Sequence, residues 1–154
     1  MKSTSKLVCF GLLSSCFAVP ALYAADNCSG YYGNEQASSE TVELSKGNKA
    51  TFFTNHETVS SGDSAYNGLG GCGGFVVVAP DGKGWVSGAC TLVAANGDTW
   101  SYTFTEELGA GRGTWKAGTG TGQFAKGSNN SGWYEYAAAA GKMSTGKWGG
   151  TCAN

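Results

Sequence analysis

The sequence predicts an all-β protein, a single antiparallel up-and-down β-barrel of about eight strands with two disulfides, and a β-sandwich is the alternative. Glycine is unusually frequent, with 26 glycines in 154 residues, and the glycines separate short segments rich in aromatic and β-branched residues. Aromatic and hydroxyl residues alternate from Thr99 to Thr105, which is typical of a strand with one buried face. Cys72 and Cys90 are spaced as partners across a hairpin, and the remaining pair, Cys28 and Cys152, suits a barrel whose first and last strands are neighbours.

The N-terminal segment has the features of a secretory signal peptide. Two lysines precede an apolar run that ends in small residues at Ala24 and Ala25. This run contains a glycine and a proline and stops at Asp26, so we do not expect a transmembrane span. We therefore expect a signal peptide at residues 1–24, one domain at residues 25–154, and a periplasmic or secreted protein.

A lipid anchor is the alternative for this segment. Leu13-Ser14-Ser15-Cys16 resembles a bacterial lipoprotein processing site, in which Cys16 would be acylated. An apolar arm from Phe17 to Ala25 would then remain on the mature protein, whereas lipoproteins normally continue into a polar linker. We therefore prefer cleavage near Ala24.

Four cysteines remain after cleavage, and an even number in an exported chain indicates disulfides. Cys72 and Cys90 are equidistant from Asp81, which lies at the centre of a turn sequence. A hairpin folded there places the two cysteines opposite each other on one face. Cys28 is then left to pair with Cys152, as expected where the first and last strands of a barrel are neighbours.

Turn residues divide the mature chain into strand-like segments. We expect strands near Glu40–Ser45, Lys49–Asn55, Gly73–Ala79, Gly84–Ala94, Thr99–Glu106, Gly113–Ala117, Ser131–Ala138 and Lys142–Gly149. Between the second and third of these, the serine- and glycine-rich segment from His56 to Gly71 predicts a long loop that acts as a flap or rim.

Five residues are the candidates for ligand binding. Trp100, Tyr102 and Phe104 share one face of a strand, which we expect to be buried. Trp133 and Glu135 share a face of a later strand. If this second face lines the interior, burial would raise the pKa of Glu135 and allow it to transfer protons. If it faces solvent, as we favour, Glu135 is a surface charge.

The segment from Gly120 to Ala125 formally fits the dinucleotide fingerprint G-x-G-x-x-G/A. That function requires a following helix and an acidic residue about 20 positions later. The next residues are turn-like, and Glu135 is too near. We therefore expect no nucleotide cofactor and assign these glycines to sharp turns and close strand contacts.

The same segment carries a family resemblance. Together with Ser131-Gly132-Trp133-Tyr134, it is similar to a pattern of allene oxide cyclase-like and dirigent-like β-barrels. A longer pattern from Gly113 to Cys152 resembles a group of small secreted bacterial proteins of unknown function. The resemblance implies a small antiparallel barrel, in some members with an apolar lumen. No catalytic residue is transferred, because Gln123 and Lys126 depart from the pattern.

Composition and motifs favour a binding protein over an enzyme. The mature chain would carry 8 basic and 11 acidic residues without a basic patch, so nucleic acid is not an expected partner. His56 is the single histidine, and there is no G-x-S-x-G elbow, so no catalytic set or metal site is evident. We expect non-catalytic binding of a small apolar ligand or a protein partner. The alternatives are a lumenal isomerase or cyclase that uses Glu135, and an envelope interaction or inhibitor protein that uses loop residues 57–70.

Overall fold

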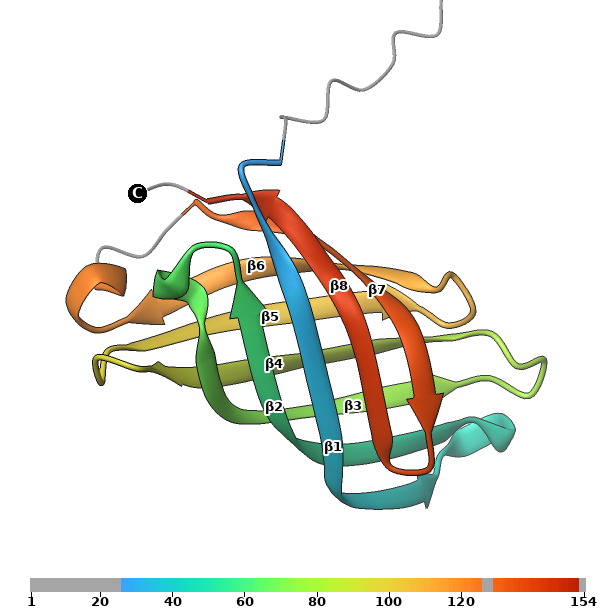
Figure 1. Ribbon diagram of the computed structural model, residues 1–154. Coiled ribbons are helices and arrows are strands. Elements are labelled where there is room, and N and C mark those ends of the chain that lie inside the picture. The colour runs from blue at the N-terminus through green and yellow to red at the C-terminus, as the bar shows by residue number, and fades with distance from the viewer. Residues whose placement is uncertain (1–25, 126–128, 153–154) are drawn as a thin grey trace, which may run out of the picture.

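The computed structural model describes residues 26–125 and 129–152, so the expected signal peptide and Cys16 lie outside the described residues. Eight strands form one closed antiparallel barrel in the order of the sequence, with β1 paired to β8 (Figure 1). The strands are β1 (Cys28–Glu43), β2 (Lys49–Ser61), β3 (Gly68–Val78), β4 (Gly84–Ala94), β5 (Thr99–Glu107), β6 (Arg112–Gly120), β7 (Ser131–Ala140) and β8 (Met143–Thr151). The up-and-down barrel is confirmed over the sandwich.

Both predicted disulfides are present. Cys72 and Cys90 are direct partners in the register of β3 with β4 and form one of the bonds. The other joins Cys28, at the start of β1, to Cys152, just after β8. The side chain of Asn27 reinforces this closure, because its amide donates to the Cys152 carbonyl (2.8 Å) and its oxygen accepts from the Cys152 amide (2.6 Å). Two such bonds are consistent with an oxidising environment.

The predicted long loop is wrong. β2 continues to Ser61 and β3 begins at Gly68, which leaves only residues 62–67 as the connection. Cross-strand pairs such as His56 with Gly71 give this polar, glycine-rich sequence regular hydrogen bonding despite its weak strand propensity. The first strand also begins earlier than predicted, at Cys28, because β1 is paired on both sides, with β2 and β8.

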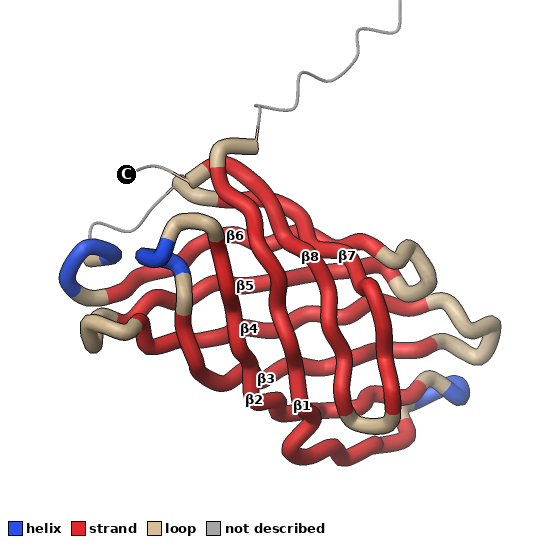
Figure 2. Tube along the Cα trace, viewed as in Figure 1, coloured by secondary structure: helices blue, strands red, loops and turns tan. Residues whose placement is uncertain are grey.

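Short helical turns lie at both ends of the barrel (Figure 2). They are η1 (Ser45–Gly47), η2 (Ser64–Tyr66) and η3 (Gly122–Phe124). The segment that fits the dinucleotide fingerprint forms the end of β6 and η3, a single turn rather than the start of a longer helix.

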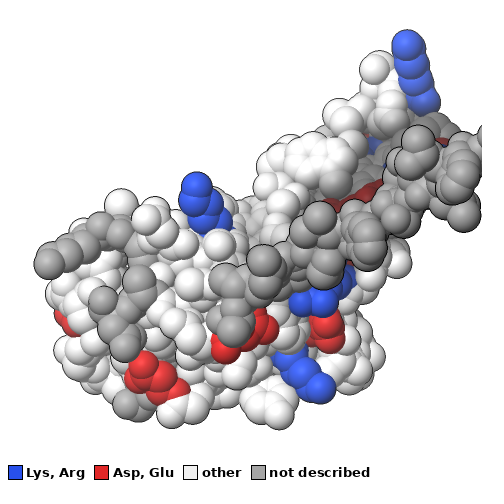
Figure 3. All heavy atoms as spheres, turned by 90° about the horizontal axis from the view of Figure 1, so that it is seen from above, with Lys and Arg blue, Asp and Glu red and all other residues white. Residues whose placement is uncertain are grey.

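Figure 3 shows one face of the molecule, on which most of the described side chains are uncharged. On the face shown in Figure 3, basic and acidic side chains are scattered among uncharged residues rather than gathered into one patch. Within the described parts of the chain, no helix has the length and apolar character needed to cross a membrane.

Candidate ligand-binding lumen

The barrel encloses a cavity of about 620 Å³. Its wall is built from side chains of alternate residues, because successive residues of a strand point to opposite faces. Most of the large side chains that line it are aromatic. Among the described residues, the lining contains no lysine, arginine or histidine, but it includes the carboxyl groups of Glu57 and Asp63. As far as the described residues line it, the lumen is therefore an aromatic space with acidic groups and no basic side chain.

Three of the five candidate residues line this cavity. Trp100, Tyr102 and Phe104 all point inward from β5, on the face that the alternation selected. The rings of Trp100 and Tyr102 stack with centroids 5.6 Å apart, and those of Tyr102 and Phe104 lie 6.4 Å apart. Together they form a continuous aromatic strip along the inner wall.

The other two candidates, Trp133 and Glu135, do not line the cavity. The indole of Trp133 donates to Asp26 (2.8 Å), and Glu135 forms an ion pair with Arg112 (3.6 Å). The guanidinium of Arg112 also lies 4.4 Å from the ring centre of Trp133. These residues form a cluster on the outer wall, where solvent and the arginine stabilise the carboxylate. Because successive side chains of β7 point to opposite faces, Tyr134 points inward.

Lumenal aromatic rings lie over glycines of the neighbouring strand. In four cross-strand pairs, a methyl group on the glycine would overlap the opposing ring. The pairs are Tyr32 with Gly146, Phe104 with Gly88, Trp115 with Gly132 and Tyr134 with Gly113. Because each glycine lacks a side chain, the ring can lie against the wall instead of projecting to the barrel axis. These four glycines, on β4, β6, β7 and β8, thus help to keep the lumen open.

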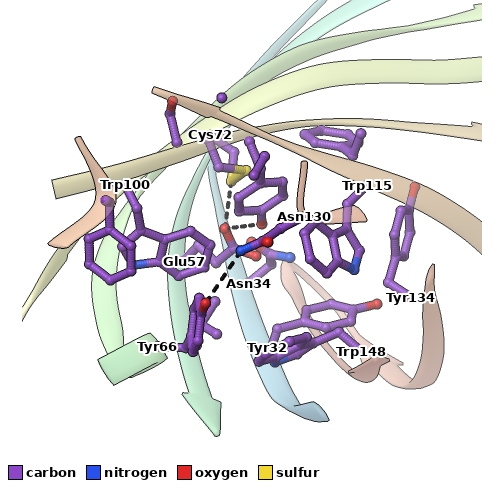
Figure 4. A pocket seen from close by; sticks show the side chains of 18 of the residues that line it. Tyr32, Asn34, Glu57, Tyr66, Cys72, Trp100, Trp115, Asn130, Tyr134 and Trp148 are labelled. Carbon is purple, nitrogen blue, oxygen red and sulfur yellow. Dashed lines mark hydrogen bonds between the residues drawn. A yellow bond between two sulfur atoms is a disulfide. The ribbon is translucent and has the colours of Figure 1, made fainter. Parts of the chain in front are cut away.

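Glu57 is the most deeply buried carboxyl group of the lining, with 5% of its surface exposed. It points inward from β2, as Figure 4 shows, and the hydroxyl of Tyr102 on β5 donates to its Oε2 atom at 2.5 Å. Burial raises the pKa of Glu57 from 4.5 to about 7, although the hydrogen bond from Tyr102 opposes the shift. Glu57 can therefore gain or lose a proton near neutral pH.

The lumenal disulfide touches this carboxyl group. The Sγ atom of Cys72 lies 3.0 Å from Oε2 of Glu57. Cys72 is bonded to Cys90 and carries no thiol proton, so this is a close contact and not a donated hydrogen bond. Burial and the adjacent Glu57 raise the pKa of Tyr102 well above its ordinary value, which keeps its hydroxyl protonated as the donor.

A second buried carboxyl group, Glu106, lies toward the other end of β5. Burial raises its pKa, and the nearby hydroxyls of Tyr134 and Tyr136 oppose the shift. The rings of Tyr32, Tyr134 and Tyr136 meet edge to face with centroids 6.1 to 6.3 Å apart. Within the described chain, Oε2 of Glu106 has no hydrogen-bond partner of ordinary geometry.

Tyr66 lies at the end of the barrel that carries the β2–β3 and β6–β7 connections. The turn η2 holds it there, since the Tyr66 amide donates to the Asp63 carbonyl at 3.1 Å. Its ring packs against Trp100, Phe124 and Trp148, with centroids 5.8 to 6.3 Å apart. The ring therefore extends the aromatic lining to this end of the cavity.

Sequence reasoning missed Glu57 and Tyr66, since both lay in the segment predicted as a loop. A signal for Glu57 was present, because Asn55, Glu57 and Val59 alternate with His56 and Thr58. The glycine and serine residues that follow led to the prediction of a loop instead of a strand. Tyr66 had no periodic signal, because its inward position depends on the turn η2 and on packing with rings that lie far away in the sequence.

Comparisons with protein-family models, with curated proteins and with solved structures each found no match for this chain.

Proposed function

We propose that this protein is a non-catalytic, periplasmic or secreted binding protein that holds a small, largely apolar molecule inside its barrel. The observation that carries the proposal is the aromatic cavity of about 620 Å³, which is within the usual size range of small-molecule sites. Such a lining offers apolar contact area, and a few polar groups, Glu57 foremost, would orient the bound molecule.

The two disulfides support export, because such bonds form in oxidising compartments. The resemblance to allene oxide cyclase-like and dirigent-like barrels agrees with a lumenal site and is part of the proposal. Catalysis through Glu135 is not included, because this residue lies on the outer wall in an ion pair with Arg112.

A matched pair of variants tests the lumen as the binding site. Ala117 lines the cavity, whereas Ala89 is exposed on the outer wall. Ala117→Trp fills lumenal space and should weaken binding of the neutral fluorescent probe N-phenyl-1-naphthylamine at least 10-fold. Ala89→Trp adds the same side chain outside and should leave the probe affinity unchanged.

Thermal unfolding of both variants shows that each is folded before binding is measured. Equal loss of binding in both variants, or no binding by the wild-type protein, would reject the lumenal site. Native mass spectrometry of protein purified from its own envelope extends the test. A co-purifying small molecule supports the proposal, and consistently empty protein contradicts it.

A lumenal isomerase or cyclase is the second candidate, and one observation favours it. The pKa of Glu57, at about 7, is that of a group able to donate and accept protons at neutral pH. Wild-type protein and the Glu57→Gln variant can be incubated with small-molecule extracts of the source cells. Products that appear with wild type alone would establish catalysis, and identical extracts would exclude this role for Glu57.

A further inference from the structure

The charged side chains among the described residues of the lumen are all acidic. Glu57 is buried in the cavity wall and Asp63 also lines the cavity, while the described lining residues include no basic side chain. A buried carboxylate is costly unless it is hydrogen-bonded or paired with a positive charge. Tyr102 supplies one hydrogen bond to Glu57, and none of the described lining residues supplies a countercharge.

Aromatic rings line the same space as this carboxyl group. Trp100, Tyr66 and Trp115 belong to the cavity that contains Glu57, and Figure 4 draws them around it. The faces of tryptophan and tyrosine rings attract cations, most strongly where water is excluded. Rings combined with a carboxylate are thus suited to a positively charged organic group and unsuited to an anion.

The outer wall of the same chain combines an aromatic ring, a carboxylate and a cation. There, Arg112 lies over the ring of Trp133 and pairs with Glu135 at 3.6 Å. The lumen repeats the aromatic rings and the carboxyl group, but its described lining residues provide no cation.

We propose that the molecule bound in the lumen is an organic cation, with an apolar body against the aromatic wall and an ammonium group paired with the carboxylate of Glu57. This inference rests on the proposed binding function and specifies the chemical class of its ligand. Tyr102 positions the carboxylate by donating to Oε2, and surrounding rings such as Trp100 shield the ion pair from water.

Three probes that share a phenyl body but differ in charge test this inference. They are phenethylamine as the cation, 2-phenylethanol as the neutral analogue and 3-phenylpropanoate as the anion. We expect the cation to bind wild-type protein at least 10-fold more tightly than the neutral probe at pH 8, as measured by calorimetry. The anion should bind more weakly than the neutral probe.

Glu57→Gln retains an oxygen that can accept from Tyr102 but removes the charge. It should bring the affinities of phenethylamine and 2-phenylethanol to within about 2-fold of each other while 2-phenylethanol still binds. Glu135→Gln removes an acidic group from the outer wall and should keep the wild-type preference. Tyr102→Phe removes the hydrogen bond that positions the carboxylate and should reduce the cation preference, although less than Glu57→Gln does.

The outcomes separate the two proposals. Equal binding of the cation and the neutral probe by wild-type protein would overturn the cation inference and leave lumenal binding intact. A cation preference that survives in Glu57→Gln would overturn the role of Glu57. Absence of binding by all three probes and by N-phenyl-1-naphthylamine would overturn the binding function itself. The wild-type series requires no variant, so a misfolded Glu57→Gln would not prevent the test.

Discussion

Glu57 and Glu135 illustrate the difference between the two faces of the barrel wall. Both are strand residues near aromatic rings. Glu135 faces outward, where Arg112 pairs with it and part of its side chain remains in solvent. Glu57 faces inward, where 5% of its surface is exposed and a tyrosine hydroxyl is its donor. The carboxyl group of Glu135 is thus solvated and paired with a cation on the outer face. That of Glu57 has no countercharge among the described residues that line the lumen.

This comparison bears on function, because the fold alone does not require an acidic group inside the barrel. An apolar residue would fill the position of Glu57 without the cost of desolvating a carboxyl group. A buried group with a shifted pKa, placed in a cavity, is a candidate functional residue for this reason. Glu135, in contrast, is explained as an ordinary surface partner of Arg112.

The largest expected effect is on pH-dependent stability. Between pH 4.5 and about pH 7, the folded protein holds a proton on Glu57 that the unfolded chain has released. Raising the pH through this window therefore favours unfolding, and the lost stability amounts to about 3 kcal/mol. Urea unfolding of ligand-free, disulfide-intact protein at pH 5 and pH 8 measures the loss.

Two variants identify the group responsible for this pH dependence. Glu57→Gln cannot release the proton and should lose most of the difference between pH 5 and pH 8, while Glu106 contributes a residual slope of the same sign. Glu135→Gln leaves Glu57 intact and should keep the wild-type difference. An unchanged slope in Glu57→Gln would show that another group is responsible.

The second expected effect compares glycines on the two faces of the wall. A methyl group at Gly146 would overlap the ring of Tyr32 and the backbone oxygen of Glu135, whereas one at Gly33 meets nothing within 4 Å. Gly146→Ala should lower the free energy of unfolding by about 2 kcal/mol, as overpacking does. Gly33→Ala should leave it unchanged or raise it by about 0.5 kcal/mol. If both variants changed the free energy of unfolding equally in urea titrations, lumenal glycines would not be needed to let the aromatic rings lie against the wall.

Much of the fold could be predicted from the sequence, because local patterns encode it. Turn residues located most of the strands, and the symmetry of Cys72 and Cys90 about Asp81 gave the register that β3 and β4 adopt. The closure of the barrel between β1 and β8 could be inferred by elimination, since Cys28 and Cys152 were the two cysteines that remained to pair. These inferences rely on the spacing of residues along the chain, which can be read without knowledge of the three-dimensional packing.

The candidate site was predicted less completely, since alternation does not reveal which face is inside. For β5, the contrast between aromatic and hydroxyl residues identified the inner face. For β7, both faces carry aromatic residues, and Trp133 with Glu135 turned out to be the outer pair. Glu57 was hidden because its pairing with Gly70 lends regular structure to a sequence that resembles a loop.

The smallest expected effect concerns the outer cluster itself. Arg112→Gln removes the ion pair with Glu135 and the contact with Trp133. The charged side chains of this ion pair are about half exposed, at 51% and 42%, and water screens such pairs. We expect a loss of about 0.5 kcal/mol in urea unfolding, smaller still at high salt, and no change in probe binding. A loss of several kcal/mol, or altered affinity for phenethylamine, would mean that the outer cluster is coupled to the lumen. If Arg112→Gln leaves probe binding unchanged, the cation preference depends on the groups inside the barrel and not on the outer cluster.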